Sequence, residues 1–68
     1  MKNRIKEFRL REGLTQKQLG EKVNVSRQAI NAIEKEKYDP SIWLAYELAQ
    51  FFQVTIEDVF NFEESRRK

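Results

Sequence analysis

The chain has 68 residues, with 13 lysines and arginines, 11 aspartates and glutamates, no cysteine and no histidine, which gives a formal net charge of +2. This length allows one small domain, near the lower limit for a core that is stable without metals or crosslinks. The composition excludes disulfides and argues against a metal site such as zinc, and the absence of a long apolar run or a signal-peptide pattern predicts a cytoplasmic protein with no membrane segment.

The charge is unevenly distributed along the chain. Residues 1 to 37 hold ten basic and five acidic side chains, a balance of +5, whereas residues 38 to 68 hold three and six, a balance of −3. A polyanion such as nucleic acid would attract the first half and not the second. Small domains also carry uneven solvated charge, so this asymmetry alone leaves both interpretations open.

In chain order, the spacing of apolar residues predicts five helices and a tail. Most of the helices follow a residue that can cap their first turn. The predicted helices cover residues 3–12, 16–23, 27–35, 42–52 and 56–61. There is no strand signal, repeat or linker, so we expect one domain over residues 1–62 and a short charged tail over residues 63–68, with too little apolar content to order itself.

The second and third predicted helices are separated by a very short break. Thr15 can cap the second helix, and Gln18 stands where a capping box requires glutamate or glutamine. Ser26 can cap the third helix. Asn24 tolerates a left-handed backbone, so it can end one helix and let the next begin at a steep angle.

The third predicted helix has two distinct faces. At about 100° per residue, its apolar side chains fall within one stripe, formed by Ala29, Ile30 and Ile33. The opposite side carries Arg27, Gln28, Asn31, Ala32 and Lys35. A polar helix face alone is usually a solvated surface, but behind a capped helix and a sharp turn it suits the reading of DNA.

The inward stripes of all helices predict one hydrophobic core. Its expected members are Ile5, Phe8, Leu14, Leu19, Val23, Val25, Ala29, Ile30, Ile33, Leu44, Leu48, Phe52, Val54, Val59 and Phe60. Gly20 lies inside the second helix, where glycine costs roughly 1 kcal/mol relative to alanine. We therefore expect a steric reason for it, namely that the third helix crosses closest there.

The segment GLTQKQLGEKVNVSRQAINAIEKEKYDPS and the closing VTIEDVF, at their fixed spacing, resemble the helix-turn-helix family of phage Cro and C1 repressors and Xre-like regulators. The similarity runs from about Arg4 to Phe60. It implies an all-α, compact five-helix lambda-repressor-like domain without a cofactor. In this family the third helix enters the major groove of DNA, and the second helix lies across it with its N-terminus against the DNA backbone.

Carried over position by position, the resemblance assigns contacts with DNA. The residues placed nearest the base edges are Ser26, Arg27, Gln28, Asn31 and Ala32. Arg27 can pair with guanine and Gln28 with adenine, and the Ala32 methyl group can meet a thymine methyl group. The expected contacts with the DNA backbone are Gln16, Lys17, Lys35 and Lys37.

The resemblance also implies an internal ion pair between Arg9 of the first helix and Glu34 of the third. The sequence departs from the family pattern at four positions. Gly20 replaces a usual alanine, and a usual glycine is replaced by Asn24, Glu36 and Gln53. We expect Glu36 to add a negative charge beside the DNA face.

There are more aromatic side chains than one small core can obviously enclose. Either they wrap the core or some of them form a subunit interface. Because family members often bind DNA as two-fold dimers with half-sites roughly 34 Å apart, we expect a homodimer on a palindromic operator. We expect the dimer to use the fourth and fifth helices, and the candidate interface residues are Trp43, Tyr46, Phe51 and Phe62.

The leading functional hypothesis is a sequence-specific regulator of transcription, a repressor that binds double-stranded DNA. The alternative is an antitoxin or another interaction module whose C-terminal aromatic surface binds a partner protein. An enzyme fits poorly, because the chain has no histidine, cysteine or glycine-rich phosphate loop and therefore offers no catalytic residues. No small-molecule ligand is indicated.

Overall fold

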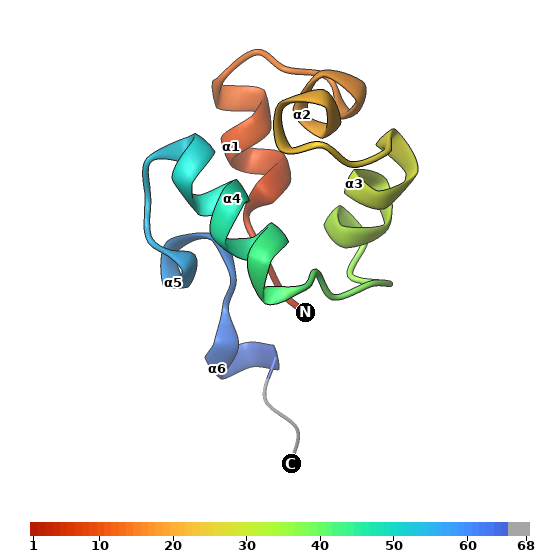
Figure 1. The fold of residues 1–68 in the computed structure, drawn as a ribbon. Coiled ribbons are helices and arrows are strands. Elements are labelled where there is room, and N and C mark those ends of the chain that lie inside the picture. Colours follow the sequence, from red (N-terminus) through yellow and green to blue (C-terminus); the bar gives the residue numbers. More distant parts are fainter. Residues whose placement is uncertain (66–68) are drawn as a thin grey trace.

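Six helices follow one another in this computed structural model, which describes residues 1–65. They are α1 (Ile5–Arg11), α2 (Gln16–Val23), α3 (Arg27–Glu34), α4 (Ile42–Phe52), α5 (Ile56–Val59) and α6 (Phe62–Ser65). α2 packs against α3 and α4, and α4 also packs against α5, while the single turn α6 lies apart from the other helices (Figure 1). The all-α class is as predicted. α6 was not predicted, and it takes in residues 63–65 of the tail that we expected not to order itself. Residues 66–68 of that tail lie outside the described residues.

The helix ends are closed by the side chains that the sequence indicated. Thr15 Oγ1 accepts from the amide of Gln18 at 3.0 Å, and Gln18 Oε1 accepts from the amide of Thr15 at 2.9 Å, which completes the predicted capping box. Ser26 caps α3 by accepting from the amide of Ala29 at 3.1 Å. These bonds satisfy amides that have no partner within the helix, so they fix where α2 and α3 begin.

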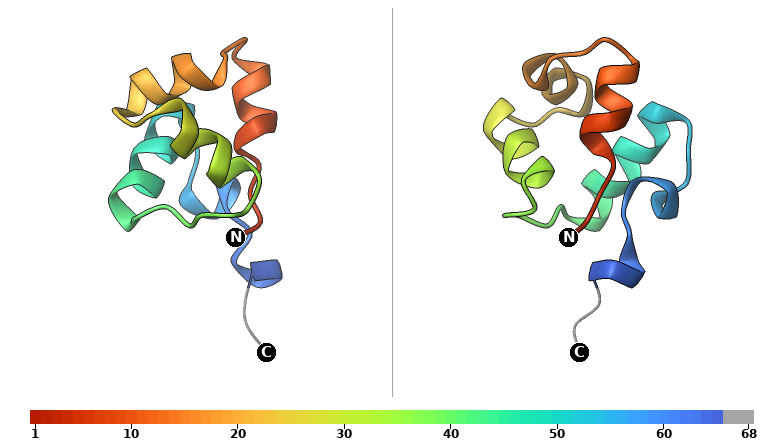
Figure 2. Two further views of the ribbon diagram at one scale, coloured as in Figure 1. Left: turned by 90° about the vertical axis from the view of Figure 1, so that its right-hand side faces the viewer. Right: turned by 180° about the vertical axis from the view of Figure 1, so that it is seen from behind.

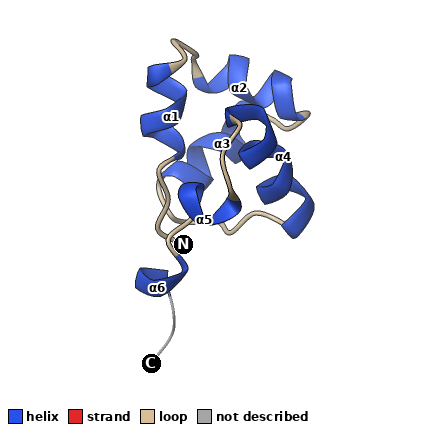
Figure 3. Ribbon diagram, turned by 90° about the vertical axis from the view of Figure 1, so that its left-hand side faces the viewer, coloured by secondary structure: helices blue, strands red, loops and turns tan. Residues whose placement is uncertain are grey.

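Two predicted boundaries differ by two residues because the segment around Asn3 pairs with the segment that follows α5. Asn3 pairs with Phe60 in an isolated antiparallel bridge, and the amide of Arg4 donates to the carbonyl of Val59 at 2.7 Å. Asn3 Oδ1 also accepts from the amide of Ile5 at 3.1 Å. As a result α1 begins at Ile5 rather than residue 3, and α5 ends at Val59 rather than residue 61. Figures 2 and 3 show the N-terminal segment running beside the segment between α5 and α6.

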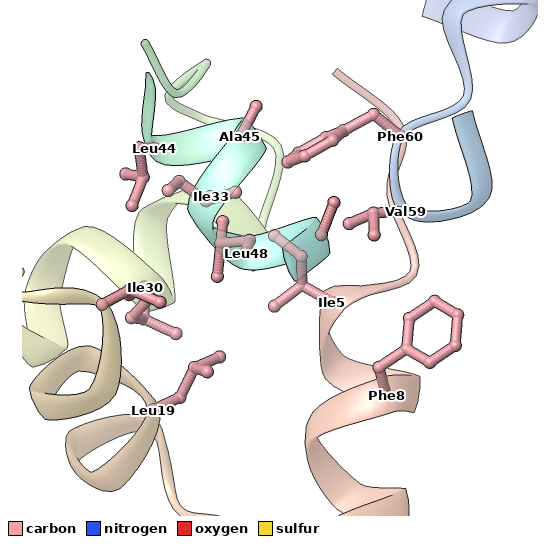
Figure 4. Packing of buried hydrophobic residues seen from close by; sticks show 12 residues of the cluster. Ile5, Phe8, Leu19, Ile30, Ile33, Leu44, Ala45, Leu48, Val59 and Phe60 are labelled. Carbon is pink, nitrogen blue, oxygen red and sulfur yellow. The ribbon is translucent and has the colours of Figure 1, made fainter. Parts of the chain in front are cut away.

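The hydrophobic core collects side chains from α1 to α5 and from the residue that follows α5. Figure 4 shows Ile5, Leu19, Ile30, Ile33 and Leu48, from four helices, pointing toward one another. The buried hydrophobic residues are Ile5, Phe8, Leu19, Val23, Ile30, Ile33, Leu44, Ala45, Leu48, Ala49, Val59 and Phe60. The other expected members, Leu14, Val25, Ala29, Phe52 and Val54, are partly buried. Ala45 and Ala49 were not predicted.

Three helices end on a residue other than glycine in the left-handed conformation. These residues are Asn24 (φ 66°), Glu36 (φ 63°) and Gln53 (φ 59°). In each case the next amide donates to the carbonyl five residues before it, which closes the helix end. The expectation for Asn24 is met. At Glu36 and Gln53, where the resemblance leads us to expect glycine, the side chain costs roughly 1 to 2 kcal/mol.

Gly20 has a steric reason that differs from the one we expected. A Cβ atom at Gly20 would lie 2.5 Å from the carbonyl oxygen of Val25 and 3.3 Å from that of Ser26. The close neighbour is thus the turn between the helices, and not the body of α3. The turn is drawn in because the amide of Val25 donates to the carbonyl of Gly20 at 2.9 Å.

We predict that Gly20→Ala destabilises the domain by roughly 1 to 2 kcal/mol, although alanine is the better helix former. The clash is with backbone, which cannot rotate away, and overpacking of this kind outweighs a propensity gain of about 1 kcal/mol. Urea unfolding followed by circular dichroism measures the change, with the exposed Lys22→Ala in the same helix as control. A Gly20→Ala variant as stable as the parent would contradict the steric explanation.

Candidate nucleic-acid interface

α3 lies on the surface of the molecule and keeps only its apolar stripe inward. Ile30 and Ile33 are at most 1% exposed, whereas Ser26, Arg27 and Gln28 are exposed, and Asn31 and Ala32 are partly buried. Figure 2 (left) shows α3 on the near side of the molecule, below α2. The side chains assigned to base reading are therefore on the outward face of α3 or at its edge.

A surface depression joins this face to the N-terminus of α2. Its lining residues are Gln16, Arg27, Gln28 and Asn31. Three of them are among the expected base-reading residues, and Gln16 is an expected backbone contact. The structure thus brings together side chains from two helices that the resemblance assigned to one DNA site. Ser26 and Ala32 do not line the depression.

The expected ion pair between α1 and α3 is formed. Arg9 Nε lies 2.7 Å from Glu34 Oε2, and Arg9 Nη2 donates to Glu34 Oε1 at 3.2 Å. The two side chains are only 9% and 4% exposed. A two-point guanidinium–carboxylate contact of this kind fixes orientation as well as distance, so α3 is held in a defined rotation relative to α1.

Hydrogen bonds extend from this pair toward the outward face. Arg9 Nη1 donates to the carbonyl of Leu14 at 2.9 Å, and Gln16 Nε2 donates to Glu34 Oε1 at 3.1 Å. Gln16 Oε1 in turn accepts from Asn31 Nδ2 at 3.3 Å. The contact between Gln16 and Asn31 was missed from sequence, because the two residues belong to different helices and no local pattern links them.

Asn3 is a second positioning residue that sequence reasoning missed. Its Nδ2 donates to the carbonyl of Ile33 at 2.9 Å, near the end of α3, and also to the carbonyl of Met1 at 3.0 Å. The carbonyl of Ile33 also accepts from the amide of Glu36 at 3.0 Å, so Asn3 is its second donor and ties the N-terminal segment to the last turn of α3. The sequence predicts Asn3 inside the first helix, although asparagine prefers turns and caps, and that preference was the available signal.

The basic side chains differ in how strongly the protein holds them. Lys17, Lys35 and Lys37 are exposed, and no ion pair within the described residues involves them. Arg4 and Arg11 instead bind Glu7 at 2.7 and 3.0 Å. The hydrogen bond from Arg4 lowers the pKa of Glu7 below its ordinary value. The lysines near α2 and α3 are thus available to an anionic partner.

Glu36 lies at the C-terminal end of α3, as the sequence indicated. Its Oε1 is 3.3 Å from Lys2 Nζ, with both side chains substantially exposed. The negative charge that we expected beside the DNA face therefore has a counter-charge close by. Exposed pairs of this kind contribute little to stability.

The aromatic residues divide between core and surface. Phe51 is partly buried and its ring meets that of Phe52 edge-on, with 5.2 Å between centroids. Trp43 is 73% exposed and Tyr46 48% exposed, both on α4. Phe62 is 46% exposed but belongs to α6 rather than to α4 or α5. The exposed apolar surface of α4, which also includes Ile42, is called the α4 patch below.

Other kinds of site find no support in the described residues. No helix among residues 1–65 is long and apolar enough to cross a membrane. That part of the chain also contains no group of three or more acidic, histidine or cysteine side chains that could hold a metal ion. The candidate functional site is therefore the outward face of α3 together with the N-terminus of α2, where polar side chains from two helices lie side by side.

A helix pair with a sharp turn, a buried inner stripe and a polar outer face defines a helix-turn-helix protein. The chain matches the helix-turn-helix family model over residues 5–59. It is 55% identical over 64 residues to an uncharacterised HTH-type transcriptional regulator of Methanocaldococcus jannaschii, covering 94% of this chain and 97% of the relative. It is 50% identical to the regulator YgzD of Bacillus subtilis, with the same two coverages.

The fold is also that of a solved structure. The chain aligns with the structure titled SinR protein/SinI protein complex at a TM-score of 0.78 and 24% identity, over 96% of this chain and 65% of the other. This likeness shows the lambda-repressor-like arrangement of helices. The chain therefore belongs to the helix-turn-helix family of Cro/C1 or Xre type, a family of DNA-binding transcriptional regulators and not of enzymes.

We predict that Arg9→Met destabilises the domain by about 3 to 5 kcal/mol, because it leaves the buried Glu34 carboxylate without its counter-ion. Removing both charges, in Arg9→Met with Glu34→Leu, should recover a large part of that loss. Urea unfolding of the single and double variants measures both effects, with Arg11→Met as the exposed control. Equal losses for Arg9→Met and Arg11→Met would contradict this assignment.

Proposed function

We propose that this chain is a sequence-specific repressor of transcription that binds double-stranded DNA in the cytoplasm, with α3 in the major groove. The single observation that carries the proposal is the depression formed by Gln16, Arg27, Gln28 and Asn31. It presents donors and acceptors from two helices on one outward face. Edges of bases in the major groove display donor and acceptor patterns that such side chains can match.

The proposed roles divide between base edges and phosphates. Arg27 can donate twice to guanine, and Gln28 can pair with adenine, which are the side-chain chemistries that read those bases. Ser26, Asn31 and Ala32 complete the base-reading set. Lys17, Lys35 and Lys37, together with Gln16, are proposed to contact phosphates, which positions the protein without selecting sequence. The exposure of the three lysines supports this division.

We predict that selection from a random duplex pool at near-physiological salt recovers a defined site. Arg27→Ala and Gln28→Ala should each relax the preference at one position, by about 1 to 3 kcal/mol. Lys6→Ala removes an exposed charge on α1 and is the matched control, expected to leave the selected sequence unchanged. The proposal fails if the parent selects no sequence or if Arg27→Ala keeps the full preference.

The proposed assembly is a homodimer that covers a palindromic site. The α4 patch supports this, because Ile42 and Trp43 are 68% and 73% exposed and neighbours on one helix. Aromatic side chains of this kind are enriched where protein surfaces meet. A second copy is the partner that would also strengthen the proposed binding to DNA, because two copies double the number of phosphate and base contacts.

We predict a dimer in sedimentation equilibrium at micromolar concentrations, and Trp43→Ser should raise its dissociation constant by about tenfold or more. Leu10→Ser is the matched control, since Leu10 is also apolar and 58% exposed but lies on α1. A parent protein that stays monomeric, both alone and on the selected DNA, would contradict the homodimer.

The same patch favours one alternative function. An antitoxin-like module would use the α4 patch to bind a different protein, while α3 still bound DNA. That alternative predicts a monomer whose Trp43→Ser variant binds the selected DNA as tightly as the parent does. The homodimer predicts weaker binding by the variant, because binding and association are then linked.

A further inference from the structure

The Glu34 carboxylate dictates the direction of every hydrogen bond that leads from it to the DNA face. An ionised carboxylate can only accept, and Glu34 is 4% exposed. Two of its bonds come from Arg9, and the third comes from Gln16 Nε2 at 3.1 Å. The amide of Gln16 therefore cannot be turned around, because its oxygen would then face the carboxylate oxygen.

The fixed amide of Gln16 sets the amide of Asn31 in the same way. With its nitrogen turned to Glu34, Gln16 turns Oε1 toward its other neighbour, and Asn31 Nδ2 donates to it at 3.3 Å. The other end of the Asn31 amide, Oδ1, makes no hydrogen bond within the described residues. No buried side-chain oxygen there lacks a partner, so Oδ1 is not fully buried, and Asn31 lines the depression.

We infer that the chain of bonds from Arg9 through Glu34 and Gln16 to Asn31, called the relay below, makes Asn31 a reader of exocyclic amino groups. This inference rests on the proposed function. Asn31 presents the acceptor Oδ1 to the major groove, where adenine N6 and cytosine N4 donate and thymine O4 and guanine O6 accept. Asn31 is the contact residue, and Gln16 and Glu34 are positioning residues.

The relay also separates two roles of Gln16. As a phosphate contact, Gln16 would raise affinity equally for all sequences. As a positioning residue, it affects one base pair only, because it stops the Asn31 amide from exchanging the places of its oxygen and nitrogen. Removing the Gln16 amide leaves the cap of α2 intact, since the capping box uses Thr15 and Gln18.

The first test uses base analogues at the base pair whose preference Asn31→Ala relaxes. Purine in place of adenine, or pyrimidin-2-one in place of cytosine, deletes the amino group. 2-Aminopurine in place of guanine, or 5-methylpyrimidin-2-one in place of thymine, deletes the carbonyl. Deleting the amino group should weaken binding of the parent by about tenfold and of Asn31→Ala by less than twofold. Whether the selected base pair is A·T or G·C tells which amino group, that of adenine or that of cytosine, Asn31 contacts.

The second set of variants asks whether the relay causes this selectivity. Gln16→Met should weaken binding to every sequence and also reduce the amino-group effect from about tenfold to about twofold. Lys17→Met, one residue along the same turn, should weaken binding while keeping the tenfold effect. The inference is overturned if Gln16→Met keeps the full amino-group effect, or if the effect coupled to Asn31 is that of the carbonyl.

The third measurement needs no DNA and separates the inference from the proposed function. In the free protein, Gln16→Met should shift the side-chain amide resonances of Asn31 and speed their exchange with solvent by roughly threefold or more, whereas Lys17→Met should not. Unchanged resonances would contradict the inference about the relay but would not contradict the proposed binding to DNA. A parent without base preference but with the relay resonances would instead overturn the proposed function.

Discussion

A guanidinium and a carboxylate that are both removed from water must satisfy each other, and this requirement organises the domain. Arg9 and Glu34 are its buried ion pair, and neither can move without leaving a charge unpaired in a low dielectric. Arg9 also donates to the Leu14 carbonyl, and Glu34 also accepts from the Gln16 amide. The positions of α1, of the loop before α2 and of α3 are therefore set by electrostatic satisfaction as well as by packing.

The geometry of the helix pair depends on a second constraint, which is the absence of a side chain at Gly20. The turn can approach α2 until the Val25 carbonyl oxygen lies 2.5 Å from the place that a Cβ atom would take. Asn24 makes this possible by adopting a left-handed conformation, for which it has a lower cost than most residues. Gly20, which has no side chain, and Asn24, which has a short amide side chain, together allow the turn between α2 and α3 to lie close to α2.

The sequence predicted what depends on neighbours along the chain. Thr15 and Ser26 cap their helices as expected, because a cap needs only the residue and amides two or three positions later. The local signal at Asn3, its bond to the amide of Ile5, was available, but its bond to Ile33 and its bridge to Phe60 join residues distant in sequence and were not predictable in this way.

The candidate site shows the same division between local and distant information. The outward face of α3 follows from helical periodicity alone. The Arg9–Glu34 pair came from the family pattern rather than from any local signal, and the Gln16–Asn31 contact came from neither. The burial of Ala45 and Ala49 was missed because α4 is apolar around much of its circumference, which leaves the inward stripe undefined.

The exposure of Trp43 determines how this protein can be observed. It is the only tryptophan in the chain, and its indole is already largely in water in the folded domain, at 73% exposure. Unfolding therefore changes its surroundings little, so its fluorescence is a poor reporter of folding. Any molecule that covers α4 takes the indole out of water and shifts its emission to shorter wavelength. The chain thus contains an optical probe of association.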